Sequence, residues 1–108
     1  MSEFDELNKD VAKFNDDRNW HKFHTPENLA KSISIEANEL LECFQWDSEN
    51  FDLEHVKEEL ADVFIYCIQM SQSLNVDLIE IAKAKMLKNA KKYPVEKAKG
   101  NATKYNKF

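Results

Sequence analysis

Apolar residues recur every three or four positions along most of the chain, which is the period of an amphipathic helix and not of a strand. The first such stripe predicts a helix over about residues 3–18 and consists of Phe4, Leu7, Val11 and Phe14. Similar stripes predict three further helices, over about residues 26–45, 53–74 and 78–92. Because short connections between helices of this length place neighbours antiparallel, we expect an all-α, four-helix bundle.

Residues with known capping preferences mark the helix boundaries. Thr25 followed by Pro26 is typical of an N-cap and a first helical residue, and Asp77 is the N-cap expected after a tight stop at Asn75. The fourth helix should end at Tyr93, since a residue that precedes proline is disfavoured in the helical region. Residues 95–108 then follow as a basic, partly ordered tail of a single domain that spans residues 1–108.

Composition excludes several other classes of protein. One glycine and two prolines in 108 residues are too few for the many tight turns of an all-β fold. The chain has no run of 18 apolar residues, and its acidic N-terminus lacks the apolar segment of a signal peptide. We therefore expect a cytoplasmic protein that does not enter a membrane.

The net charge of −5 is distributed unevenly. Residues 1–82 contain 19 acidic and 6 basic residues, whereas residues 83–108 contain nine lysines and one acid. An acidic body argues against nucleic acid as the main partner, because such binding requires a broad basic surface. Two interpretations remain open: the acids hold a metal and the lysines a polyanionic ligand, or both are solvated helix faces.

The two cysteines do not have the spacing of a zinc site. Cys43 and Cys67 lie among apolar residues without a CxxC pattern, which favours reduced thiols in the core.

The acidic residues of the second and third predicted helices are not equivalent when placed at about 100° per residue. Glu36 and Glu39 lie on one flank of the second helix's apolar stripe, while Glu42 faces water. On the third helix, with Leu60 at the centre of the stripe, Glu59 and Asp62 share a flank with Tyr66, and Glu58 points to the other side.

If these two helices pack antiparallel, the four flanking carboxylates converge on one site. Four unpaired carboxylates in a poorly solvated place would raise one another's pKa, whereas a hard cation would stabilise them. Oxygen ligands suit Mg²⁺, with Mn²⁺ as a possible substitute. The alternative is that all four are solvated surface acids.

At these residues the sequence resembles a known family. Glu36-Ala37-Asn38-Glu39, a gap of 19 residues and then Glu59-Leu60-Ala61-Asp62 resemble the ExxE…ExxD signature of the all-α NTP pyrophosphohydrolases, the MazG-like superfamily. Further segments, at 18–24, 26–29, 44–46, 58–66 and 92–94, are similar to the dCTP pyrophosphatase branch in particular. The resemblance covers about residues 4–105.

The resemblance implies roles for eleven residues, and His24 is added to them as a hypothesis. It makes Glu36, Glu39, Glu59 and Asp62 the catalytic Mg²⁺ ligands. The substrate-binding positions that we carry over or add as hypotheses are Trp20, His24, Trp46, Tyr66, Lys85, Asn89, Lys92 and Tyr93. Relatives can carry a histidine near the base where this chain has Val11, and this difference leaves the base selectivity open.

The residues themselves support some of these roles. Trp20 and Trp46 both fall in polar connectors, where an aromatic ring favours a stacking wall over a core position, although core packing remains an alternative. His24 is a candidate ligand contact beside a structural role. Glu39 is our candidate for a general base that acts through water.

We therefore expect a Mg²⁺-dependent nucleotide pyrophosphohydrolase that cleaves dCTP or a modified dCTP to the monophosphate and pyrophosphate. The alternatives are a broader dNTPase that includes dATP, and a non-catalytic helical interaction or regulatory module. The third predicted helix is apolar over most of its circumference, which favours burial on more than one side. Relatives form intertwined dimers or dimers of dimers, so we also expect a homo-oligomer.

Overall fold

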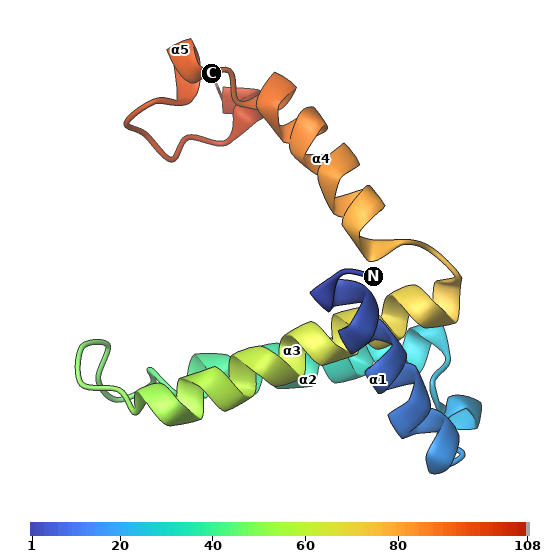
Figure 1. Ribbon diagram of the computed structural model, residues 1–108. Helices are drawn as coiled ribbons and strands as arrows, with labels where there is room; N and C mark the ends of the chain where they lie inside the picture. Colours follow the sequence, from blue (N-terminus) through green and yellow to red (C-terminus); the bar gives the residue numbers. More distant parts are fainter. Residues whose placement is uncertain (108) are drawn as a thin grey trace. The chain divides into compact units, whose positions relative to one another are not determined.

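The computed structural model describes residues 1–107, and the predicted all-α class is confirmed (Figure 1). No strand occurs in this described part of the chain. Its helices are α1 (Glu3–Asp17), α2 (Pro26–Glu42), α3 (Leu53–Leu74), α4 (Leu78–Lys92) and α5 (Val95–Ala98), with short 3₁₀ helices at His21–Phe23 and Tyr105–Lys107. The chain forms two compact units, Met1–Val76 and Asp77–Phe108.

Helices α1 to α4 begin where a side-chain oxygen accepts a hydrogen bond from a free backbone amide. Thr25 Oγ1 accepts from the Asn28 amide at 3.2 Å, and Asp77 Oδ1 accepts from the Glu80 amide at 3.0 Å. These two bonds confirm the N-caps that the sequence predicts for α2 and α4. Ser2 adds a capping box at the start of α1, which the apolar pattern does not predict.

The helices end for equally local reasons. Asn75 has φ 55° and accommodates the left-handed turn that stops α3, and Tyr93 before Pro94 ends α4 as predicted. The prediction was wrong for α2, which ends three residues before position 45. There the amides of Cys43, Phe44 and Gln45 bond to carbonyls three residues back, and this tighter turn brings the Phe44 ring against Phe51 at 4.8 Å.

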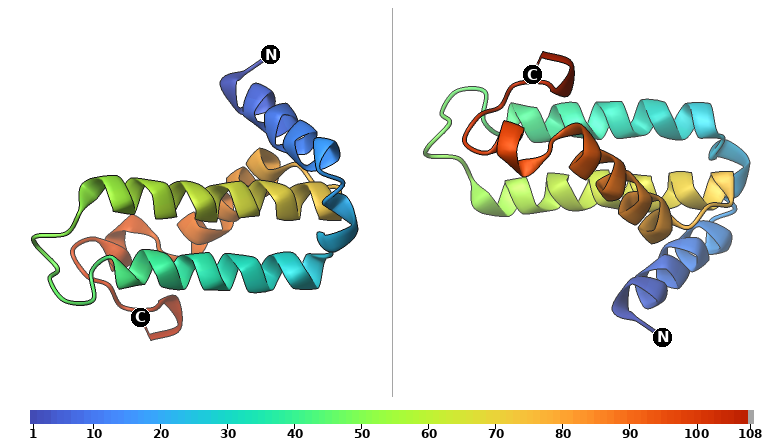
Figure 2. Two further views of the ribbon diagram at one scale, coloured as in Figure 1. Left: turned by 90° about the horizontal axis from the view of Figure 1, so that it is seen from below. Right: turned by 90° about the horizontal axis from the view of Figure 1, so that it is seen from above.

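In the first unit, α2 and α3 form an antiparallel hairpin, and α1 packs on α3 (Figure 2). Gln72 Nε2 donates to the Asn8 carbonyl and to Asn8 Oδ1, both at 2.8 Å, and so ties α3 to α1. Among the described residues, the buried apolar side chains are Val11, Leu29 and Ile68, one from each of these three helices. The buried polar residues are Asn15, Gln69 and Ser71.

The apolar stripe predicted as core is only partly covered. Leu60, the predicted centre of the α3 stripe, is 56% exposed, and Phe64 and Leu41 are also exposed. The prediction was wrong for these residues because the α3 flank at Leu60 has no covering helix in this unit. Cys43 and Cys67 are free and half-buried, and burial followed by the charge of Glu59 raises the pKa of the Cys43 thiol.

The second unit carries the basic end of the chain. Its tail includes α5 and the final 3₁₀ helix, and it turns at Gly100, where φ is 82°. The Tyr105 ring lies 6.0 Å from the Tyr93 ring, and Lys92 Nζ lies 4.7 Å from the Tyr105 ring centre. Among residues 1–107, no helix combines the length and the apolar character that crossing a membrane would require.

Candidate functional site

Acidic side chains from α2 and α3 meet on one flank of the hairpin. Oxygen atoms of Glu36, Glu59 and Asp62 all lie within 4.8 Å of one another. Glu36 and Glu59 are half-buried, and Asp62 is exposed. Because the helices are antiparallel, the i, i+3 spacing on each brings together carboxylates that are far apart in the sequence, as the helical period predicted.

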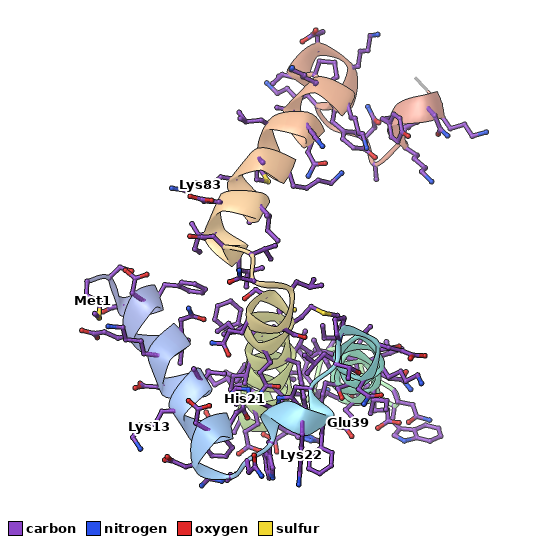
Figure 3. The ribbon with its side chains drawn as sticks, turned by 90° about the vertical axis from the view of Figure 1, so that its right-hand side faces the viewer. Met1, Lys13, His21, Lys22, Glu39 and Lys83 are labelled. Atoms are coloured by element: carbon purple, nitrogen blue, oxygen red, sulfur yellow. The ribbon has the colours of Figure 1, made fainter. Side chains whose placement is uncertain are left out.

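Glu39 joins this group as a fourth carboxylate; Figure 3 looks along the two helices and labels it on α2. Burial, hydrogen bonding to Glu39 and the charges of Glu39, Asp62 and Glu59 raise the pKa of Glu36 to about 7. Burial also raises the pKa of Glu59, again with hydrogen bonding to Glu39. Two carboxyl groups that share a hydrogen bond require a proton between them, so the group resists carrying its full negative charge.

Two oxygen atoms of the cluster lack any partner. Glu36 Oε2 and Glu59 Oε2 are both buried, and neither accepts a hydrogen bond from the described residues. Buried acceptors without donors are costly, and an all-oxygen set of anionic ligands is what Mg²⁺ or Mn²⁺ prefers. The residues present therefore fit a hard divalent cation.

His55 is a neighbour of the cluster that sequence reasoning missed. Its Nε2 lies 3.2 Å from Glu59 Oε1, and its charge acts to lower the pKa of Glu59 against the stronger effect of burial. The histidines lack the spacing of metal ligands, and the useful signal is instead the separation of four residues that puts His55 and Glu59 on one helix face. A histidine in this place can orient the Glu59 carboxylate.

The two acids that the sequence placed on other faces do lie elsewhere. Glu42 and Glu58 are exposed, and neither belongs to the group of converging oxygens. They are near in sequence to the cluster and alike in chemistry, so they are natural controls for it.

A cavity of about 350 Å³ opens beside the carboxylates, between α1 and α3. The Trp20 ring stands edge-on to Phe14 at 5.7 Å, and the Arg18 guanidinium lies 3.6 Å from the Phe14 ring centre. Asp62 lines this cavity and also belongs to the acidic cluster, so the two are contiguous. The lining is largely apolar and consists of Asp10, Val11, Phe14, Trp20, Asp62, Ile65, Tyr66 and Gln69.

The structure brings together some of the predicted substrate-binding residues and not others. Trp20 and Tyr66 share the cavity, whereas Trp46 lies in the α2–α3 connector and is 89% exposed. His24 lines a second, more polar cavity of about 230 Å³ together with His21, labelled in Figure 3, and its carbonyl accepts from Ser73 Oγ at 3.0 Å. Burial and then the charge of His21 lower the pKa of His24, which favours the neutral form of its ring.

The remaining predicted residues belong to the second unit, on α4 and at its end. Lys85 is exposed and Asn89 half-buried, and the Asn89 carbonyl accepts from the Tyr93 amide at 2.9 Å. Lys92 lies against the Tyr105 ring. Sequence reasoning missed Gln69, although a glutamine within the apolar run of α3 was a visible signal.

The raised pKa of Glu36 predicts how stability depends on pH. The unfolded chain loses this proton near its ordinary value of 4.5, whereas the folded chain holds it to about 7, so stability from this group falls as pH rises between the two. We expect a lower Tm in chelator at pH 8 than at pH 5.5, and a larger rise in Tm on adding Mg²⁺ at pH 8. In Glu36→Gln both effects should shrink; an Mg²⁺ shift of equal size at the two pH values would contradict the expectation.

Comparisons with known proteins find one matching family model and several similar proteins. The model of the MazG-like family matches residues 31–108. The dCTP pyrophosphatase 1 of Mus musculus is 36% identical over 103 residues, covering 87% of this chain and 61% of that protein, and the Homo sapiens protein is 32% identical over 106 residues. The chain thus spans about three fifths of the length of these curated relatives. A solved pyrophosphatase structure from Archaeoglobus fulgidus DSM 4304 is 44% identical, with a TM-score of 0.81 over 87% of this chain and 94% of that one.

Proposed function

Because the chain belongs to the MazG-like family, we propose that it is a metal-dependent nucleotide pyrophosphohydrolase that cleaves between the α and β phosphates of a nucleoside triphosphate. The observation that carries this proposal is the position of Asp62, which lies both in the acidic cluster and in the wall of the apolar cavity. A nucleotide that placed its base in the cavity would hold its phosphates beside the carboxylates. The products are the nucleoside monophosphate and pyrophosphate.

The four carboxylates would hold the cation. When bound, Mg²⁺ supplies the positive charge that screens the phosphates and activates a water. Glu36, Glu59 and Asp62 present converging oxygens, and His55 orients Glu59. Glu39 lies close enough to raise the pKa of both Glu36 and Glu59, and we assign to it the removal of a proton from the attacking water.

The other parts of the substrate have their own partners in this proposal. Trp20 and Tyr66 line a cavity wide enough for a base to stack on an aromatic ring. In this proposal the triphosphate and ribose are bound by residues on α4 and at its end, namely Lys85, Asn89, Lys92 and Tyr93. Lys85 and Lys92 supply the positive charge that neutralises the phosphates. We also propose that residues 1–108 act as a single nucleotide pyrophosphohydrolase domain, with deoxynucleoside triphosphates as the substrate class and dCTP or a modified dCTP as the favoured member.

Release of pyrophosphate from a panel of dNTPs, with and without Mg²⁺, tests the proposal. We expect Mg²⁺-dependent release and the highest kcat/KM for dCTP or a 5-substituted dCTP. A dATP rate close to the dCTP rate would instead identify the broader dNTPase. Absence of release from every dNTP at saturating Mg²⁺ would contradict the proposal and favour the non-catalytic interaction module.

The protein should act as a homo-oligomer, a dimer or a dimer of dimers. The large apolar side chains of Leu60, Phe64 and Leu41 are exposed, and burial against a partner surface would stabilise them. A second copy of the same chain would cover them symmetrically. Sedimentation equilibrium at micromolar concentration checks this; a Leu60→Glu variant should shift the equilibrium toward monomer, with exposed Lys31→Glu as the control. A monomer that hydrolyses dNTPs at full rate would refute it.

A further inference from the structure

Two cavities of the first unit meet at Gln69. The apolar cavity is lined by Trp20, Tyr66 and Gln69, and the polar one is lined by Gln69 together with Asn15 and His24. Among the described residues, Gln69 is therefore the only uncharged polar side chain in the lining of the apolar cavity beyond the tyrosine and tryptophan. A base bound in this cavity could therefore form a hydrogen bond with the Gln69 carboxamide.

Gln69 lacks the hydrogen bonds that its burial requires. Only 8% of the residue is exposed, and its Oε1 has no partner among the described residues. Asn15, which is 1% exposed and lines the polar cavity with it, has an unpartnered Oδ1 as well. Buried polar groups are nearly always paired, so this wall is short of hydrogen-bond donors in the orientation that the structure records.

The wall is held in place around these two groups. The Asn15 carbonyl accepts from the Trp20 amide at 3.0 Å, which fixes the loop that carries the stacking ring. Ser71 Oγ donates to the Ile68 carbonyl at 2.6 Å on the turns of α3 next to Gln69. The carboxamide of Gln69 itself turns about a terminal torsion with a broad, roughly two-fold profile. A half-turn exchanges Oε1 and Nε2, so that Nε2 can be directed to the wall that carries Asn15 Oδ1 and Oε1 to the apolar cavity.

The geometry points to Gln69 as the residue that selects the base, through an exocyclic amino group. With Oε1 turned into the cavity, an amino group donates to it, while a keto oxygen in the same place faces an oxygen without a proton between them. Cytosine and adenine carry such an amino group, and uracil, thymine and the O6 edge of guanine carry a keto oxygen. The inference rests on the proposed function only in taking the cavity as the site of the base.

The test compares pairs of nucleotides that differ at this group. We expect kcat/KM for dCTP to exceed that for dUTP, and kcat/KM for dATP to exceed that for dGTP. Gln69→Met keeps the length of the side chain and removes both polar atoms. It should lower the dCTP-to-dUTP ratio by about tenfold, and its Tm should equal or exceed that of the wild type, because a buried orphan group has been removed. Gln45→Met, on an exposed glutamine of the α2–α3 connector, is the matched control.

Binding of dCMP and dUMP, which requires no turnover, separates this inference from the proposed function. A preference for dCMP over dUMP that disappears in Gln69→Met supports the inference, whether or not any dNTP is hydrolysed. Absence of hydrolysis would count against the proposed function alone. Hydrolysis with an unchanged dCTP-to-dUTP ratio in Gln69→Met overturns the inference and leaves the function standing. Gln69→Leu is the second variant if Gln69→Met does not fold, and an unchanged ratio there overturns the inference equally.

Discussion

Replacing Glu39 or Glu59 by glutamine should lower kcat/KM by about a hundredfold or more while the helical circular dichroism stays unchanged. The same holds for Glu36→Gln and Asp62→Asn. Each change keeps the shape of the side chain and removes one negative charge from the group that would hold the cation. The loss should appear in kcat/KM at every Mg²⁺ concentration for Glu39, and be partly relieved by high Mg²⁺ for the others.

The thermal stability of these variants should not fall together with their activity, and this difference separates a functional role from a structural one. The raised pKa values of Glu36 and Glu59 show that the folded protein disfavours their charged forms. A neutral amide at either position should therefore leave Tm in chelator unchanged or higher at pH 8. A variant that loses both activity and stability would indicate a structural role.

Glu42→Gln and Glu58→Gln are the matched controls for charge. Both acids are exposed and lie outside the cluster, so their replacement should leave pyrophosphate release close to the wild-type rate. Equal losses from Glu42→Gln and Glu39→Gln would refute the assignment of the helix faces, and with it the geometric argument for the site.

Local signals in the sequence were sufficient for most boundaries of α1 to α4, but not for α5, which falls in the predicted partly ordered tail. Thr25, Asp77 and Tyr93-Pro94 act through their own backbone neighbours, and the boundaries that they predict are the observed ones. The end of α2 was missed because it depends on a contact between Phe44 and Phe51 across the connector. A boundary set by a tertiary contact is not visible in the period of a single helix.

The difference between local signals and tertiary contacts also applies to the acidic cluster and the cavities. The helical period determines which acids share a face, so the sequence alone is enough to pair Glu36 with Glu39 on one helix and Glu59 with Asp62 on the other. Burial could not be predicted in this way, because the stripe around Leu60 has the same pattern whether a helix of its own chain or another molecule covers it. Gln69 was missed because its meaning depends on which cavities meet at it.

Replacing Trp20 by alanine should raise KM by roughly tenfold and reduce discrimination among bases, since stacking contributes about 1–3 kcal/mol per base. Trp20 lines the cavity beside Tyr66, and its backbone is fixed by the Asn15 carbonyl, so the ring is held ready for a base. Steady-state kinetics on dCTP and dUTP, with a thermal melt of the variant, checks this. If Trp20→Ala unfolds at room temperature, or keeps wild-type kinetics while folded, the ring is a core residue.

Trp46→Ala should have a similar effect on KM for a different reason. The Trp46 ring is 89% exposed and absent from the cavity lining, so its action on the base requires a second copy of the chain to receive it. Mixing Trp46→Ala with Glu59→Gln provides the measurement. If Trp46 of one copy serves the carboxylates of another, a mixed oligomer contains one site with both the ring and all four acids intact. Activity at low dCTP should then exceed the sum of the two variants measured alone. Strict additivity in an oligomer that exchanges subunits would show that Trp46 does not act across copies, and unchanged KM in Trp46→Ala would remove it from the site.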